Sequence, residues 1–440
     1  MGNSDMMENQ VSEYDVIIVG AGLAGLSAAK VLHEEGKSYM ILEATERPGG
    51  KVYSKTSEDT SRYFELGAQF INKEMIEIVK LIEETGMTLT RNEGTQNSIV
   101  ISDKSKELIN LDFSDITDTL GAISGEHFDS KPLDQVLEKH ISQKRKRQIL
   151  KSFIAAETTV NSRYINAEAM KNLVSRVTTT TSGLEYQASD PLSNVIKYLE
   201  TLNKDAIHYL EPVAKVKETK SGYTLKTKNK AKHHTKALIM AVPPTAASRI
   251  TFSSTIADHY RPYLESYTDG AVIKMTFVYD TPFWRERDIK DKKKSIYGVI
   301  YSAHEGVNLM DSSKESGENR LTLFIGGDKA KELADVPIEV KEFYARERLI
   351  EVLGEDAEHY KDYEISEWQH SPYYGGGYGA IIHHHGIPDA NKTLREPHRN
   401  MVFASTELAF DFPLFMEGAV RSGQYAAKRL LEKMSENVTE

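Results

Sequence analysis

The sequence has no cysteine among its 440 residues. This absence excludes disulfides, thiolate metal sites, redox dithiols and any group attached through a cysteinyl sulfur. Any electron transfer by this protein would therefore have to proceed through a bound cofactor.

Long apolar runs are also missing, since no segment approaches the roughly 18 residues of a membrane span. The N-terminal segment MGNSDMMENQVSEYD lacks the basic and apolar regions of a secretory signal. Met6 stands where a myristoylation motif has Ser or Thr. We therefore expect a cytoplasmic protein without a membrane anchor.

Excess positive charge is absent too, because the formal net charge is −10. This charge disfavours nucleic-acid binding and slightly favours cationic substrates. The basic runs at 144–147 and 290–294 could indicate nucleic-acid binding, but a solvated helix face explains each better. Three consecutive histidines at 383–385 cannot all reach one ion from an extended chain, and no acidic or thiol partner lies at ligand spacing. We expect neither a nucleic-acid partner nor a metal.

The most informative segment present is 15–51, DVIIVGAGLAGLSAAKVLHEEGKSYMILEATERPGGK. Its first residues, 15–19, form a short run that is apolar after Asp15, which suits a strand of a buried parallel sheet. A G-x-G-x-x-G pattern follows, made by Gly20, Gly22 and Gly25. These glycines allow a tight turn, close approach of a pyrophosphate, and close packing of helix on strand, in that order.

The context strengthens this weak pattern. Residues 23–35 have helical spacing and end at Gly36, where a left-handed cap fits. A second strand at 39–42 then ends at Glu43, placed to accept hydrogen bonds from an adenosine ribose. We therefore interpret the segment as a dinucleotide site rather than a plain βαβ turn.

A second glycine loop beside the first favours FAD over NAD. Gly49 and Gly50 lie between two cations, Arg47 and Lys51, which suits a pyrophosphate with a bulky second half. The segment resembles the N-terminus of the flavin-containing amine oxidase family, which includes monoamine and polyamine oxidases. In that family the second motif usually ends in Arg, whereas Lys51 keeps the charge without the bidentate fork.

The resemblance implies an FAD site to which the N-terminal motifs contribute Gly20, Ala21, Gly22, Leu23, Ala24, Gly25, Glu43, Ala44, Arg47, Gly49, Gly50 and Lys51. It further implies contacts from Ala68, Gln69 and Phe70 under the flavin, although a buried strand and turn would explain 63–70 equally well from pattern alone. Backbone at Val213 would meet the adenine. Trp368 and Tyr373 would belong to one wall of the flavin site.

The C-terminal region resembles the F-A-G-T-E and Y-M-E-G-A motifs of the family, with Ser405 in place of Gly. The resemblance implies that a helix N-terminus there faces the flavin and stabilises negative charge on it. The implied contacts come from Ser405, Thr406, Glu407, Met416 and Ala419. Phe70 stands where related amino-acid oxidases carry a carboxylate-binding Arg, so we expect amines as substrates rather than amino acids.

Lys274 is the first candidate catalytic residue. In a strand over 270–279 it would share a face with the apolar Val272 and Val278. An edge strand with Lys274 in solvent explains the pattern as well. The family has a similar G-x-V-x-K segment with PFW following, and the resemblance implies that Lys274 holds a water against flavin N5.

Tyr378 and Phe415 are the other two candidates, because they match the aromatic cage of the family. Gly377 occupies the position at which membrane-bound relatives bond FAD through cysteine, so we expect non-covalent FAD. Phe415 replaces the commoner Tyr, which predicts a preference for amines with an apolar or aromatic body. The C-terminal membrane anchor of the mitochondrial relatives is also missing.

The predicted fold is α/β, with a Rossmann-type FAD-binding domain interleaved with a mixed-sheet plus helical substrate domain. We assign 1–88, 190–262 and 371–440 to the FAD-binding domain, and 89–189 and 263–370 to the substrate domain.

The resemblance implies oxidation of an amine to an imine, then hydrolysis to an aldehyde or ketone, with O2 reduced to H2O2. The alternatives are an amine dehydrogenase with a protein electron acceptor, a polyamine or amino-acid oxidase or desaturase of the same superfamily, and a flavin-binding protein without turnover. A homodimer is left open.

Overall fold

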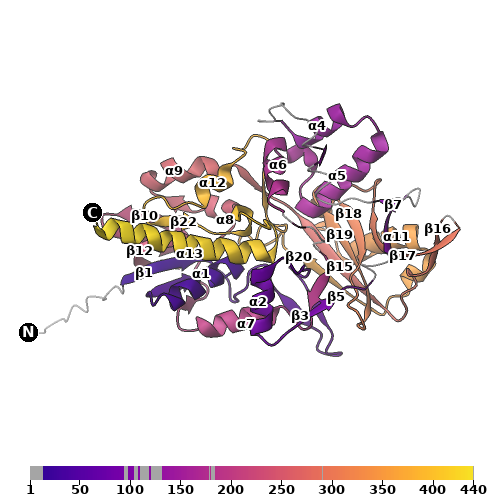
Figure 1. Ribbon diagram of the computed structural model, residues 1–440, viewed down its shortest axis with the longest axis horizontal. Coiled ribbons are helices and arrows are strands. Elements are labelled where there is room, and N and C mark those ends of the chain that lie inside the picture. The colour runs from indigo at the N-terminus through magenta and orange to yellow at the C-terminus, as the bar shows by residue number, and fades with distance from the viewer. Residues whose placement is uncertain are drawn as a thin grey trace, which may run out of the picture.

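The structure is a computed structural model that describes residues 13–93, 98–103, 108–109, 118–119, 131–177, 179, 184–289 and 291–439. Two large sheets organise this part of the chain (Figure 1). The first forms the half that contains the start of β1 and the end of α13, and the second lies in the other half, beside a group of helices.

The first sheet has eight strands in the described chain. Their order is β13 (Thr251–Phe252), β10 (Val213–Thr219), β11 (Gly222–Thr227), β12 (Lys232–Met240), β1 (Glu13–Val19), β2 (Tyr39–Leu42) and β9 (Ile207–His208), with β22 (Met401–Phe403) beside β12. The pairs of β1 with β12 and β2 are parallel. The central strands read as continuous apolar runs because helices cover both faces.

Alternate side chains of β1 enter two separate cores. Val16 and Ile18 pack on one face and Ile17 and Val19 on the other. The first core is covered by α1 (Leu23–Glu34), α2 (Ile76–Glu84), α7 (Ser193–Leu202) and α13 (Met416–Thr439). The second is covered by α8 (Pro244–Ser248), α9 (Ser254–Leu264) and α12 (Ala390–Leu394).

The second sheet is mostly antiparallel. Its order is β20 (Asp362–Glu367), β15 (Val272–Tyr279), β19 (Asn319–Gly326), β18 (Val307–Asp311), β17 (Lys292–Ile300), β6 (Ser98–Ser102) and β7 (Leu108–Ile109), with β16 (Arg287–Ile289) beside β17. The helical elements after β19 are α10 (Asp328–Leu333), α11 (Ile338–Leu353) and η2 (Glu355–Glu358). A further helical group contains α4 (Leu133–His140), α5 (Lys144–Thr158), η1 (Ser162–Tyr164) and α6 (Ala167–Ser175).

Three small two-stranded sheets and one short helix complete the described elements. The sheets pair β3 (Ser54–Thr56) with β4 (Tyr63–Glu65), β5 (Leu89–Arg91) with β8 (Tyr186–Ala188), and β14 (Tyr267–Asp269) with β21 (Ala380–Ile382). The helix is η3 (Thr406–Leu408). Across the residues described, no helix has both the length and the apolar character needed to cross a bilayer.

The predicted fold class is confirmed, because a βαβ unit with a glycine turn sits in a sheet separate from a mixed sheet with helices. The predicted boundaries of the two interleaved domains stay a prediction. The basic run at 144–147 forms the first turn of α5, with side chains exposed or half-buried. Of the run at 290–294, Lys290 lies outside the described residues, and 292–294 begin strand β17, so the expected helix face is wrong there.

Candidate functional site

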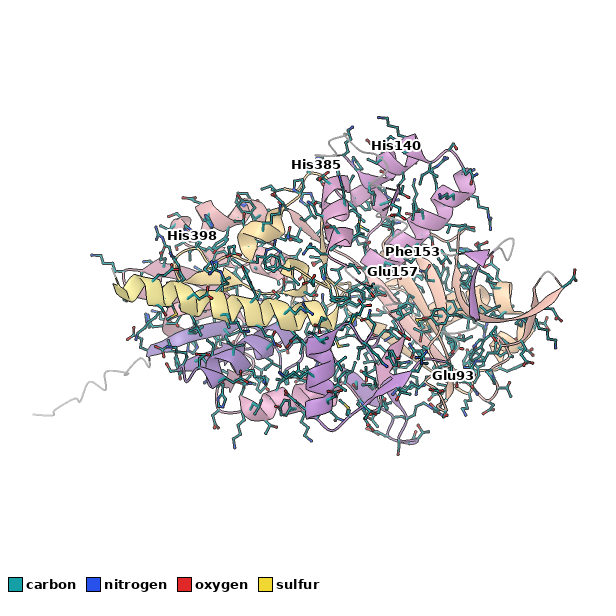
Figure 2. The ribbon with its side chains drawn as sticks, viewed as in Figure 1. Glu93, His140, Phe153, Glu157, His385 and His398 are labelled. Atoms are coloured by element: carbon teal, nitrogen blue, oxygen red, sulfur yellow. The ribbon has the colours of Figure 1, made fainter. Side chains whose placement is uncertain are left out.

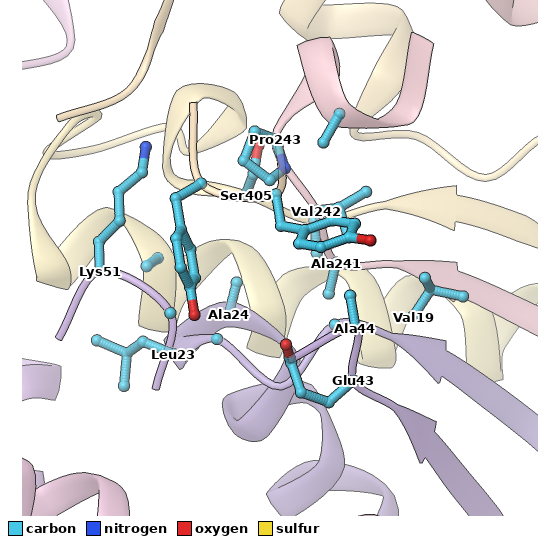
Figure 3. A pocket seen from close by; sticks show the side chains of 18 of the residues that line it. Val19, Leu23, Ala24, Glu43, Ala44, Lys51, Ala241, Val242, Pro243 and Ser405 are labelled. Atoms are coloured by element: carbon cyan, nitrogen blue, oxygen red, sulfur yellow. The ribbon is translucent and has the colours of Figure 1, made fainter. Parts of the chain in front are cut away.

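A cavity of about 460 Å³ lies where the carboxyl ends of the central strands meet the glycine loops (Figure 3). Most of the predicted site residues line it. These are Gly20, Gly22, Leu23, Ala24, Glu43, Ala44, Gly49, Gly50, Lys51, Ala68, Val213, Tyr373, Tyr378, Ser405, Thr406, Glu407, Phe415, Met416 and Ala419. Segments from both ends of the chain therefore build one cavity.

Each of the three positions in the first loop requires glycine for a different structural reason. Gly20 has φ +106°, and a Cβ on it would lie 2.3 Å from the Ala241 carbonyl oxygen. A Cβ on Gly25 would lie 1.9 Å from the Gly20 carbonyl oxygen, so helix α1 could not approach the turn. Around Gly22, by contrast, the nearest atom to an added Cβ is the Gly50 Cα at 4.0 Å. The protein itself leaves space above Gly22, as a loop must where a pyrophosphate approaches the backbone.

The Glu43 carboxylate is held in place by the loop. Its Oε2 accepts a hydrogen bond of 2.7 Å from the Ala21 N–H, and its Oε1 accepts bonds of 2.9 Å from the Thr45 N–H and hydroxyl. Ionised carboxylate oxygens together have about four acceptor positions. Glu43 can therefore accept a ribose hydroxyl without losing these bonds.

The two cations of the second loop take different places. Lys51 lines the cavity, its Nζ donates to the Tyr378 carbonyl oxygen at 3.3 Å, and burial lowers its pKa. Arg47 is not among the lining residues. Its guanidinium donates to the carbonyl oxygens of Pro48 at 3.2 Å and Gly50 at 2.8 Å. It therefore braces the loop from behind.

Other predicted contacts also lie behind the cavity wall. Ala21 and Gly25 are absent from the lining, and Ala21 acts through its N–H to Glu43. Gln69 donates to the Gln187 side chain at 2.7 Å, and Phe70 packs edge-on against Phe324. The Trp368 indole donates to the Leu66 carbonyl oxygen at 3.2 Å. These residues position the wall rather than face the cavity.

Several lining residues were not predicted. Lys228 donates to the Tyr373 hydroxyl at 3.3 Å, and Arg249 pairs with Asp269 at 3.0 Å. The others include Pro212, Ala214, Lys215, Tyr374 and Leu414. Lys228, Arg249 and Leu414 lie in segments without a motif, so no local pattern marks them. The other four are neighbours of the predicted Val213 and Tyr373 in the sequence.

Lys274 is buried. Strand β15 lies between β19 and β20, so the edge-strand alternative is wrong. Its side chain is 5% exposed, and its Nζ donates to the carbonyl oxygens of Glu65 at 2.7 Å and Gly67 at 3.2 Å. Burial lowers the pKa of Lys274, and the Glu65 carboxylate opposes this shift. Lys274 does not line the cavity but anchors the segment that leads to Ala68.

The segment before α13 presents polar groups to the cavity. Glu407 accepts from the Ala380 N–H at 2.8 Å, and the Thr406 hydroxyl donates to the Phe415 carbonyl oxygen at 2.8 Å. The Ser405 hydroxyl is buried and, within the described part of the chain, has no hydrogen-bond partner. A buried polar atom without a partner at a cavity wall fits a site built for a polar ligand.

Gly377 has no room for a side chain. A Cβ built on it would lie 1.9 Å from the Thr159 Oγ1. The sequence contains no cysteine, and the packing around position 377 would leave no space for one beside Tyr378.

The comparisons with known proteins agree with this arrangement. The family model described as flavin containing amine oxidoreductase matches residues 23–431. The chain is 26% identical over 458 residues to amine oxidase (flavin-containing) B of Homo sapiens, covering 96% of this chain and 86% of the relative. The same identity, length and coverage hold for the flavin-containing amine oxidase of Oncorhynchus mykiss.

Solved structures share the fold. Cyclohexylamine oxidase from Brevibacterium oxydans has a TM-score of 0.84 at 21% identity, covering 96% of this chain and 100% of that one. A putrescine oxidase bound to putrescine has a TM-score of 0.81 at 23% identity, with 96% and 99% covered.

The open space above Gly22, the anchored Glu43 and the unpaired Ser405 hydroxyl are the features that an FAD site needs. Since the family model spans nearly the whole chain, the protein belongs to the flavin-containing amine oxidoreductases and is an enzyme that uses FAD to oxidise amines.

Proposed function

We propose that this enzyme oxidises a primary or secondary amine to an imine, which water hydrolyses to an aldehyde or ketone, and that O2 takes up the electrons as H2O2. One observation carries the proposal. Tyr378 and Phe415 line the same cavity as the glycine loops, so a substrate between them would be next to the cofactor.

Bound FAD supplies the acceptor for the hydride that leaves the substrate carbon. In the proposal, the residues of the first loop and Glu43 hold its pyrophosphate and ribose. The start of α13 at Met416 lies at the cavity, where a helix N-terminus stabilises negative charge. Lys274 donates two N–H groups to the carbonyl oxygens of Glu65 and Gly67, and the family resemblance implies that its third would hold a water that reaches the reacting atoms.

The aromatic residues control the protonation state of the substrate. A carbon–hydrogen bond next to nitrogen gives up a hydride readily when nitrogen keeps its lone pair. Apolar walls disfavour the ammonium form because desolvation lowers the pKa of an amine. Two rings also restrict how the substrate approaches, and such positioning lowers the barrier.

The first prediction is that the cofactor is bound without a covalent link. Acid precipitation of the holoenzyme should release all flavin into the supernatant, because no cysteine exists and Gly377 has no space for a side chain. Yellow colour that stays in the pellet after washing would contradict this expectation.

The second prediction concerns the substrate class. Mixed anaerobically with the enzyme, benzylamine, phenethylamine or cyclohexylamine should bleach the flavin faster than putrescine or spermidine, because Phe415 makes one wall more apolar. Phe415→Ala should slow bleaching and leave the FAD content unchanged. Faster reduction by a polyamine would show that this substrate preference is wrong.

The same experiment separates the alternatives. If amines bleach the flavin but air does not restore it while a cytochrome does, the enzyme is an amine dehydrogenase. If no amine bleaches it, a desaturase or a protein without turnover is favoured. Cytoplasmic location and a homodimer stay predictions from the sequence.

A further inference from the structure

Glu157 is a carboxylate that the proposed reaction has not yet used. It lies in the last turn of α5, where its neighbours Ala155, Ala156 and Thr158 are buried. Its own side chain is half-buried and so keeps some accessible surface. Figure 2 labels it toward the middle of the molecule. Among the described residues, no hydrogen bond or ion pair to Glu157 is found.

The end of α5 is fixed to the wall that carries Tyr378. The Thr159 carbonyl oxygen accepts a hydrogen bond of 2.9 Å from the Ala271 N–H, at the start of β15. Thr159 Oγ1 fills the space beside Gly270 and Gly377 that side chains would otherwise occupy. Glu157 is two residues before Thr159 and is not among the residues that line the cavity. Its carboxylate interacts electrostatically with the Tyr378 phenol, so it lies behind the wall that carries Tyr378.

Electrostatics supports this placement. Burial raises the pKa of Glu157 to about 7, and within the described part of the chain no cation offsets the shift. Burial, and after it the Glu157 carboxylate, raise the pKa of the Tyr378 phenol above its ordinary value. An unpaired carboxylate inside a protein is costly unless a partner arrives to neutralise it, and such groups concentrate at functional sites.

We propose that Glu157 is the substrate-binding carboxylate of this enzyme, which pairs with the ammonium group of the arriving amine beside Tyr378 and takes up its proton. This inference rests on the proposed function, since it assigns the recognition of an amine. In the step, an N–H bond of the ammonium breaks and an O–H bond forms on Glu157. Nitrogen keeps the electron pair, so the amine enters the apolar cage neutral.

The test uses benzyltrimethylammonium, which carries a permanent charge and cannot lose a proton. Its binding to the holoenzyme is measured from the change in flavin absorbance at pH 5.5 and pH 8.5. The ionised fraction of a group with pKa about 7 rises roughly thirtyfold between these values. Wild-type affinity should therefore rise about tenfold or more toward pH 8.5, and Glu157→Gln should bind weakly at both values.

Two controls isolate the carboxylate. Glu332→Gln makes the same chemical change at a side chain that is 65% exposed, and should behave as wild type. Glu157→Asp keeps the charge, so its binding should retain the pH dependence. If Glu157→Gln loses FAD, wild type and Glu157→Asp still decide the question, because binding that is flat with pH in both overturns the proposal.

A kinetic readout tests the proton transfer. The kcat/KM for benzylamine should show an acid limb near pH 7 in wild type and not in Glu157→Gln, whereas the limb set by the amine's own pKa, at higher pH, should remain in the variant. A limb near pH 7 that Glu157→Gln retains overturns the assignment. The binding experiment needs no turnover, so pH-dependent binding in an enzyme that oxidises no amine would refute the proposed function and leave this inference standing.

Discussion

Replacement of Gly22 by alanine is expected to remove FAD from an otherwise folded protein. An added Cβ meets no protein atom closer than 4.0 Å, so the stability of the apoprotein should not change. The methyl group would instead occupy the space for the pyrophosphate and lengthen its hydrogen bonds to the loop. Loss of about 3 kcal/mol of such charge-assisted bonding corresponds to roughly a hundredfold weaker binding.

The measurement is FAD affinity by titration of the apoprotein, with the melting temperature of the apoprotein as the check on folding. Gly25→Ala is the matched comparison, because its Cβ would lie 1.9 Å from the Gly20 carbonyl oxygen. That variant should lose stability before any cofactor is added. Normal FAD affinity in Gly22→Ala would mean that the pyrophosphate lies elsewhere.

Lys274→Met should keep FAD bound and lower turnover in air by about tenfold or more, the effect of losing one positioned polar group worth roughly 1.4 kcal/mol. Methionine has similar length but cannot donate to the carbonyl oxygens of Glu65 and Gly67 or hold a water. Separate measurements of the rates of flavin reduction and flavin reoxidation show which of the two steps the substitution slows.

Lys341→Met provides the control for removing a buried amine. Lys341 is 7% exposed and donates to the Ala334 carbonyl oxygen at 2.9 Å, far along the sequence from the glycine loops. The Lys341→Met substitution should lower the stability of the protein and leave the rates of flavin reduction and reoxidation per bound flavin unchanged. Equal rates in Lys274→Met and wild type would reduce Lys274 to an anchor of the 65–67 segment.

Local sequence patterns predicted the βαβ unit of the first sheet well. The apolar run of β1, the glycine turn and the spacing of α1 lie within a few residues of one another, so their causes are local. The same holds for the helix N-terminus predicted in the C-terminal region, which the structure places at Met416 of α13.

Features that depend on distant segments could not be predicted. Whether β15 is an edge strand depends on β19 and β20, which pair with it from later in the chain. Arg47 turned away from the cavity because the rings of Tyr53 and Tyr374 lie 4.2 Å and 5.2 Å from its guanidinium. No motif in the sequence marks Glu157, because its lack of a partner among the described residues is visible only in three dimensions.

The cavity is closed by two segments from opposite ends of the chain. The glycine loop follows β1, whereas Ser405 and Met416 come from β22 and α13, which pack against β12 and α1. A growing polypeptide folds progressively from its N-terminal side during synthesis. The pyrophosphate loop can form once β12 and Ala241 have been made, because β1 pairs with β12 and Gly20 packs against Ala241, but the cofactor can be retained only after the residues from about 401 onward have left the ribosome. Flavin loading is in consequence a late step in the biosynthesis of this enzyme.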